Sequence, residues 1–81
     1  MSNYAEALQL YFVNLKEYQE MGDSINVTNS YNSIGFAYFK QNKYDEAINY
    51  LNKGLLLAKE VGAKDKELFC YKTLAESFIA K

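Results

Sequence analysis

Residues 31–55 read YNSIGFAYFKQNKYDEAINYLNKGL, and within them two apolar stripes flank a short polar turn. After the turn, apolar residues recur at spacings of three and four, the pattern of one face of an amphipathic helix. They are Tyr44, Ala47, Ile48, Leu51, Leu55 and Ala58. Before the turn, a second face is formed by Val27, Tyr31, Ile34, Ala37, Tyr38 and Gln41. Asn42 suits the left-handed backbone of a tight turn, so the pattern predicts consecutive helices over residues 25–41 and 44–61.

The chain repeats its own pattern at an offset of 40 residues. Residues 3–8, NYAEAL, align with residues 43–48, KYDEAI, and residues 20–22, EMG, align with residues 60–62, EVG. A period of 20–50 residues is typical of proteins built from stacked repeats. The offset therefore predicts two further helices, over residues 3–20 and 65–80. Gly22 and Gly62 follow the helical stripes at the place where a left-handed residue ends a helix.

The composition excludes several classes of function. The chain has one cysteine and no histidine, which leaves no disulfide framework, no zinc site and no Ser-His or Cys-His nucleophile pair. We therefore expect no cofactor and no metal. The net charge of −1 predicts no strong field for nucleic acid or an anionic membrane surface. No segment approaches the roughly 18 apolar residues of a membrane span, and the start lacks a signal peptide, so we expect a cytoplasmic protein without a membrane partner.

Residues 31–58 resemble a tetratricopeptide repeat, TPR. The family's pattern is an aromatic, Leu-Gly and a second aromatic on one helix, then an alanine and a bulky residue on the next. The matching residues are Tyr31, Ile34, Gly35, Tyr38, Tyr44, Ala47, Leu51, Gly54 and Leu55. Gly35 and Ala47 are small enough to let two antiparallel helices approach closely. The resemblance implies an all-α fold, a right-handed TPR-type solenoid of about four antiparallel helices.

The repeat departs from the usual TPR in two ways. The proline that normally follows the second helix is absent, and the second helix runs on to Val61. This longer form resembles the 40-residue repeats of bacterial sensors and regulators. By this resemblance, residues 1–81 are a single TPR fragment. Residues 3–20 match the second helix of a partial repeat, residues 25–61 one whole repeat, and residues 65–80 the first helix of a further repeat.

TPR proteins use their first helices to line a concave groove that takes a peptide or a helix. Mapping that face onto this chain gives nine candidate partner-binding residues: Asn29, Asn32, Ser33, Phe36, Lys40, Phe69, Lys72, Thr73 and Glu76. The asparagines suit hydrogen bonds to a peptide backbone, and Phe36 and Phe69 suit its side chains. The alternative is a solvated face without a ligand. The family's carboxylate-clamping groove is matched only in part, because Phe36 and Glu76 stand where that groove would place an asparagine.

No residue is expected to be catalytic. Cys70 is expected to be a small buried apolar residue, since free cysteine usually behaves in that way. The acidic residues Asp45, Glu46, Glu17 and Glu20 fit helix ends rather than an active site. The sequence therefore predicts a non-enzymatic module that binds a protein or peptide, plausibly an excerpt of a larger bacterial signalling or regulatory protein.

The alternative is a structural unit that self-assembles through incomplete ends. The stripe Tyr4, Leu8, Tyr11 and Leu15 is expected to face a helix that would precede it, and Leu74, Ala75 and Phe78 are expected to need a following helix. Both faces would then be open to a second copy. A closed homodimer is favoured over a head-to-tail filament, because a two-fold contact terminates by symmetry.

Overall fold

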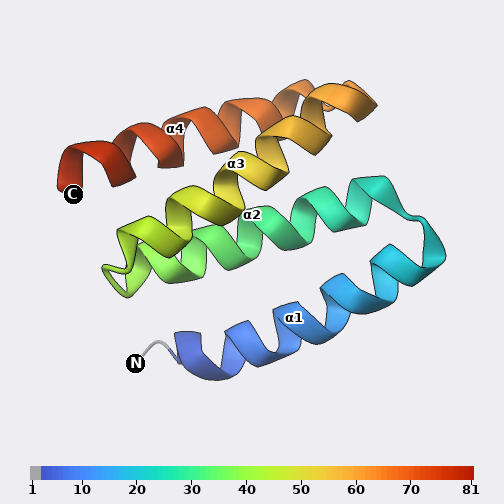
Figure 1. The fold of residues 1–81 in the computed structure, drawn as a ribbon, viewed down its shortest axis with the longest axis horizontal. Coiled ribbons are helices and arrows are strands. Elements are labelled where there is room, and N and C mark those ends of the chain that lie inside the picture. Colours follow the sequence, from blue (N-terminus) through green and yellow to red (C-terminus); the bar gives the residue numbers. More distant parts are fainter. Residues whose placement is uncertain (1–2) are drawn as a thin grey trace.

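The computed structural model describes residues 3–81 and contains four helices and no strand within that range. They are α1 (Tyr4–Met21), α2 (Ser24–Lys40), α3 (Tyr44–Val61) and α4 (Lys64–Ala80) (Figure 1). The all-α fold of four antiparallel helices is confirmed. Each helix boundary lies within one residue of the position expected from the apolar stripes and turn residues.

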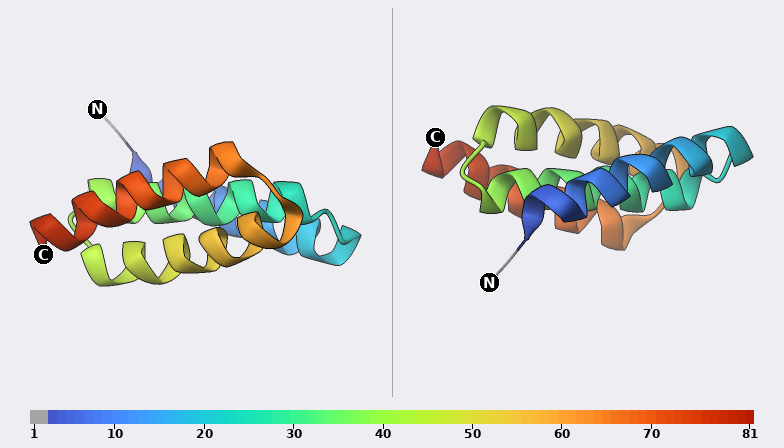
Figure 2. Two further views of the ribbon diagram at one scale, coloured as in Figure 1. Left: turned by 90° about the horizontal axis from the view of Figure 1, so that it is seen from above. Right: turned by 90° about the horizontal axis from the view of Figure 1, so that it is seen from below.

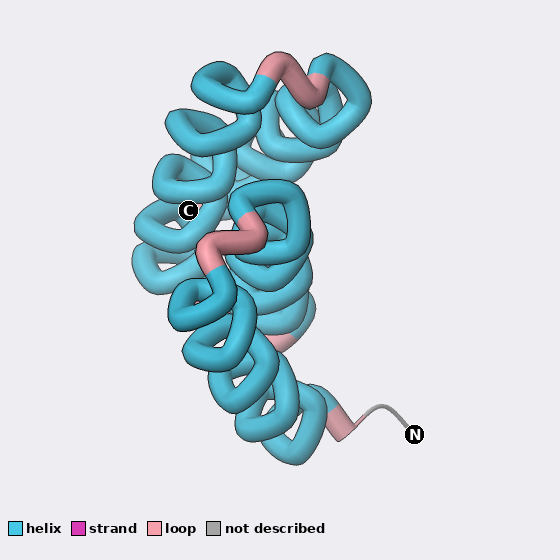
Figure 3. The backbone as a smooth tube through the Cα atoms, turned by 90° about the vertical axis from the view of Figure 1, so that its right-hand side faces the viewer, coloured by secondary structure: helices cyan, strands magenta, loops and turns pink. Residues whose placement is uncertain are grey.

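The helices end where the sequence supplies residues that fit a tight turn. Gly22 and Gly62 take left-handed φ angles of 72° and 71°, and Asn42 does so at 63°. At the helix starts, the Asn3 and Asp23 side chains accept hydrogen bonds from backbone amides three residues later. Such caps satisfy amides that have no partner inside the helix. The resulting connections between successive helices are short turns (Figure 3).

The four helices stack so that α1 and α4 form its two ends, with α2 and α3 between them (Figures 1 and 2). Each helix packs on the one that follows it in the chain, and α2 also touches α4. That last contact brings residues about 40 apart in the sequence side by side. It therefore places α2 and α4 on a shared face of the molecule.

Two apolar clusters hold the stack together. The first joins α1 to α2 and contains Leu8, Leu15, Val27, Ile34 and Ala37. The second joins α3 to α4 and contains Ala47, Leu51 and Leu74. Aromatic rings surround the first cluster, and Tyr38 packs against both clusters, which makes the core continuous along the stack.

The partner of the first helix differs from the expectation. Leu8 and Leu15 pack against α2, the following helix, so the prediction that they face a preceding helix is wrong. Ile48 and Leu55, 40 residues later, likewise pack in the cluster that holds Leu74 of α4. These positions therefore serve the next helix in the stack. The expectation that Leu74 lacks a partner is wrong for the same reason.

The closest approach of two helices lies between α2 and α3. A Cβ placed on Gly35 would lie 2.6 Å from Leu51 Cγ and 3.4 Å from the Ala47 carbonyl oxygen. A second close approach lies at Gly54, where an added Cβ would overlap Asn32 Oδ1 and lie 3.3 Å from Tyr31 Cβ. The missing side chains of Gly35 and Gly54 thus set the distance between these helices.

Candidate functional site

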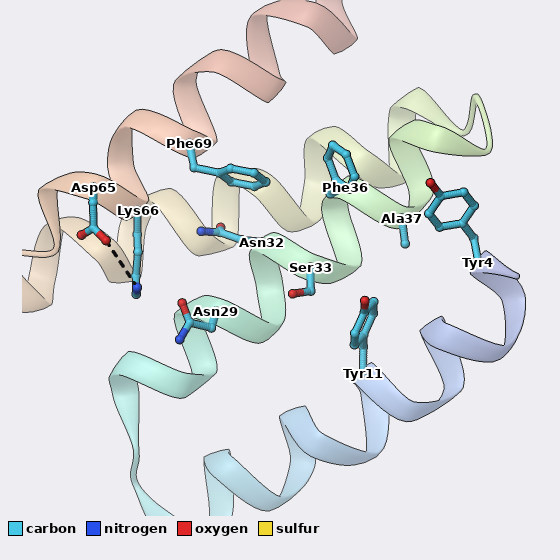
Figure 4. Close-up of a pocket in the computed structure, with 10 residues that line it drawn as sticks. All are labelled: Tyr4, Tyr11, Asn29, Asn32, Ser33, Phe36, Ala37, Asp65, Lys66 and Phe69. Atoms are coloured by element: carbon cyan, nitrogen blue, oxygen red, sulfur yellow. Dashed lines mark ion pairs between the residues drawn. The ribbon is translucent and has the colours of Figure 1, made fainter. Parts of the chain in front are cut away.

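A pocket with a volume of about 410 Å³ opens where α1, α2 and α4 meet (Figure 4). Helix α2 contributes Asn29, Asn32, Ser33, Phe36 and Ala37. Helix α4 contributes Asp65, Lys66 and Phe69, and α1 contributes Tyr4 and Tyr11. The pocket exists because the α2–α4 contact aligns these two helices while α1 diverges beside them. It is the surface on which small apolar and polar groups of a ligand find the most partners.

Two phenylalanine rings form the apolar side of the pocket. The ring centroids of Phe36 and Phe69 lie 6.0 Å apart, and their side chains are 36% and 38% exposed. Phe39 extends the cluster, with its ring 6.3 Å from that of Phe36. Lys40 Nζ lies 5.3 Å from the centroid of the Phe36 ring, at a distance suited to a cation–π contact. The two rings therefore share one half-exposed apolar surface that crosses from α2 to α4.

Polar groups occupy the remainder of the pocket wall. Asn29 is exposed and its Nδ2 donates to Asn26 Oδ1 at 3.5 Å. Ser33 is half-buried, and Tyr11 approaches from α1 on the side of the pocket opposite Phe69 (Figure 4). Asp65 and Lys66 form an ion pair of 3.7 Å at the rim. This wall offers amide and hydroxyl groups, and its two opposite charges lie side by side.

Asn32 has a structural partner. It is buried, and its Oδ1 accepts a hydrogen bond from the Cys70 thiol, with the two atoms 2.9 Å apart. Burial raises the pKa of the Cys70 thiol to about 11, the Asn32 hydrogen bond opposes that rise, and the charge of Glu67 adds to it. The thiol therefore stays protonated at neutral pH, whereas a reactive cysteine is a thiolate. Cys70 is fully buried, as expected from its residue type.

The pocket brings together five of the nine predicted partner-binding residues: Asn29, Asn32, Ser33, Phe36 and Phe69. The other four, Lys40, Lys72, Thr73 and Glu76, do not line it. Thr73 is 4% exposed and offers no open surface, because α4 turns this residue into the helix stack. Lys40, Lys72 and Glu76 are exposed.

Half of the pocket lining was not predicted from the sequence. Tyr4 and Tyr11 were assigned to the core stripe of the first helix, but they also line the pocket. Ala37, Asp65 and Lys66 complete the group that the sequence analysis missed. Their common signal is position: they lie on the same helix faces as Ser33 and Phe69, one turn away.

Within residues 3–81, no group of three or more Cys, Asp or Glu side chains is placed to hold a metal ion. No helix in this range is both long enough and apolar enough to span a bilayer. The pocket accordingly consists of apolar, amide and hydroxyl groups plus one ion pair.

Helices that pair antiparallel, repeat at an offset of 40 residues and cross at small residues define a helical-repeat protein. Residues 28–60, which span most of α2 and nearly all of α3, match the family model of the tetratricopeptide repeat. This segment is a tetratricopeptide repeat, which confirms the resemblance, and such repeats generally mediate protein–protein interactions. No curated protein and no solved structure matches the chain.

Proposed function

We propose that the face shared by α2 and α4 binds a peptide segment of a partner protein and performs no chemistry. The observation that carries this proposal is the pair of half-exposed rings, Phe36 and Phe69, at the pocket of about 410 Å³. Exposed aromatic side chains that cluster on one surface are typical of protein interaction sites. The general role of tetratricopeptide repeats supports the same conclusion.

The pocket suggests how such a peptide would be held. An apolar side chain of the peptide packs between the rings of Phe36 and Phe69. The exposed Asn29 amide lies on the same wall and is placed to hydrogen-bond the peptide backbone. Lys40, Lys72 and Glu76 border this face as exposed charges and would select among peptide sequences. Buried Asn32 and Thr73 support the face from below.

The setting of the chain is also part of the proposal. We place it in the cytoplasm as part of a larger bacterial signalling or regulatory protein, on the resemblance of its 40-residue repeat to those of such proteins. In this arrangement α1 is the second helix of one repeat and α4 is the first helix of another. The similar packing of α1 on α2 and of α3 on α4 supports that division.

Self-association is a second candidate. It is favoured by large apolar side chains that are exposed at both ends of the stack: Leu10, Val13, Leu68, Tyr71, Phe78 and Ile79. Apolar surface of this kind gains free energy when a partner covers it, at about 25 cal/mol per Å² before the entropy of association is deducted.

Peptides selected from a random displayed library test the peptide-binding proposal. We expect Phe36→Ala and Phe69→Ala each to weaken binding of the tightest selected peptide by about 2 kcal/mol, a factor of about 30 in Kd. Both residues are more than a third exposed, so helicity measured by circular dichroism should persist. Leu56→Ala on α3, where Leu56 is 67% exposed, is the matched control and should keep the wild-type Kd. A double Phe36→Ala, Phe69→Ala variant with wild-type affinity would refute the proposal.

A further inference from the structure

The exposed apolar residues of α4 correspond to residues of α2 that α3 covers. Forty residues separate each pair: Thr28 and Leu68, Tyr31 and Tyr71, Gly35 and Ala75, Tyr38 and Phe78. Thr28 is fully buried, whereas Leu68 is 68% exposed, and Phe78 is 60% exposed where Tyr38 is half-buried. The outer face of α4 thus presents the positions that α2 uses to bind α3, and within residues 3–81 no helix covers it.

The outer face of α1 is the counterpart of the face that α3 offers to α2. Ala47 and Leu51 are fully buried there. Their equivalents Ala7 and Tyr11 are only half-buried, since the described chain places no helix over this side of α1. Leu10 corresponds to Tyr50 and is 66% exposed. One end of the stack therefore carries an α2-like face and the other an α3-like face.

Contacts inside the chain show which residues would meet. The Tyr50 ring lies 5.8 Å from that of Tyr38 and 6.3 Å from that of Tyr31. Moving both partners by the repeat gives Leu10 on one copy against Phe78 and Tyr71 on another. The Phe39 and Tyr44 rings, 5.8 Å apart, give Ile79 against Tyr4 in the same way. All of these transferred pairs are apolar or aromatic.

The packing itself obeys the 40-residue step. Gln19 Nε2 of α1 donates to Tyr31 Oη of α2 at 3.3 Å. At the equivalent positions, Lys59 Nζ of α3 lies 5.7 Å from the centroid of the Tyr71 ring of α4. The same two positions are thus in contact in successive helix pairs, so one more step along the stack would place a second copy in the same geometry.

We propose that the outer face of α4 in one copy binds the outer face of α1 in a second copy, head to tail, in the register of α2 on α3. The α4 face comprises Leu68, Tyr71, Ala75, Phe78 and Ile79, and the α1 face comprises Tyr4, Ala7, Leu10 and Tyr11. This deepens the proposed self-association by naming its surfaces, and it does not depend on peptide binding. It replaces the closed homodimer expected from the sequence with an open chain of copies, because the two surfaces differ from each other.

The contact between copies is looser than the contact between α2 and α3. Ala75 stands where Gly35 lies, and Asn14 stands where Gly54 lies, so each close approach gains a side chain. Association is therefore concentration-dependent. Docking also covers the Tyr4 and Tyr11 side of the pocket, while Phe36 and Phe69 lie on its other side.

Two single substitutions separate the possible arrangements of copies. Leu10→Asp places a charge on the α1 face and Phe78→Asp places one on the α4 face, both at exposed positions where helicity should persist. In sedimentation velocity, the wild type should grow in mass with concentration. Each variant alone should stay a monomer, and an equimolar mixture of the two should form a two-chain species and nothing larger. Leu56→Asp, a charge at an exposed site on neither face, should associate as the wild type does.

Other outcomes overturn the proposal in distinguishable ways. If Leu10→Asp alone dimerises, α4 pairs with α4, and if Phe78→Asp alone dimerises, α1 pairs with α1. Either result replaces the head-to-tail contact with a two-fold dimer while self-association stands. A wild-type chain that is folded by circular dichroism and monomeric at every concentration removes both.

Discussion

Replacing Gly35 with leucine should destabilise the chain more than any other single change at an exposed or half-exposed helix surface. A Cβ at this position would lie 2.6 Å from Leu51 Cγ and 2.9 Å from Leu51 Cδ2. The leucine side chain beyond that Cβ would have to separate α2 from α3, because Ala47 backbone lies behind at 3.4 Å. Overpacking of this kind costs typically 1–3 kcal/mol and occasionally more.

That cost is large for a chain of 81 residues, whose total stability we expect near the lower end of about 5–15 kcal/mol. Urea unfolding followed by circular dichroism gives the measurement, with a lower midpoint expected for Gly35→Leu. Asn49→Leu adds the same side chain at an exposed position of α3 and should change stability by less than about 0.5 kcal/mol. Equal midpoints for Gly35→Leu and the wild type would show that the helices do not cross at Gly35.

Leu51→Ala should be the most damaging truncation. Leu51 is fully buried, touches the Gly35 position and belongs to the cluster that includes Ala47 and Leu74. Removing its branched end leaves a cavity between three helices, and such losses cost about 2–5 kcal/mol. The same truncation at exposed Leu56 should cost little, which separates the cavity from the loss of helix propensity.

Gly35 and Leu51 should also be coupled. Gly35→Ala in the wild type forces its new methyl group against Leu51, but in a Leu51→Ala background the methyl group fills vacated space. The double variant should therefore be more stable than the sum of the single changes indicates, by about 0.5–3 kcal/mol. Strict additivity in urea unfolding would mean that the two positions are not in contact.

The apolar stripes predicted the helices well because burial and helical period act locally. Gly22, Asn42 and Gly62 mark the turns through their own backbone preferences, so the helix boundaries follow from nearby residues. The 40-residue offset also predicted that small residues stand at the helix crossing, as Gly35 does.

The direction in which each stripe faces was harder to predict. An inner helix of a stack has two neighbours, and an apolar stripe shows that residues are buried without showing against which helix. Leu8 and Leu15 were for this reason assigned to a preceding helix, although they pack on α2. Only the comparison with Ile48 and Leu55, whose neighbours are both present, resolves the choice.

Asn32 shows why polar residues of the site were misplaced. Its spacing puts it on the face of Asn29 and Phe36, and a lone asparagine is usually exposed. It is buried because Gly54 leaves room for it and because Cys70, 38 residues later, donates a hydrogen bond to its side chain. Such a pairing depends on how α2 meets α4, which no local pattern contains.

The central claim is that the face shared by α2 and α4 is the binding surface. Its most direct test is a titration of the labelled chain with the tightest library-selected peptide, followed through the amide chemical shifts of each residue. The largest shifts are expected at Asn29, Phe36 and Phe69, with little change around Leu56 on α3. Shifts that cluster around Leu56, or on the end faces around Leu10 and Phe78, would contradict the claim and move the binding surface elsewhere on the stack.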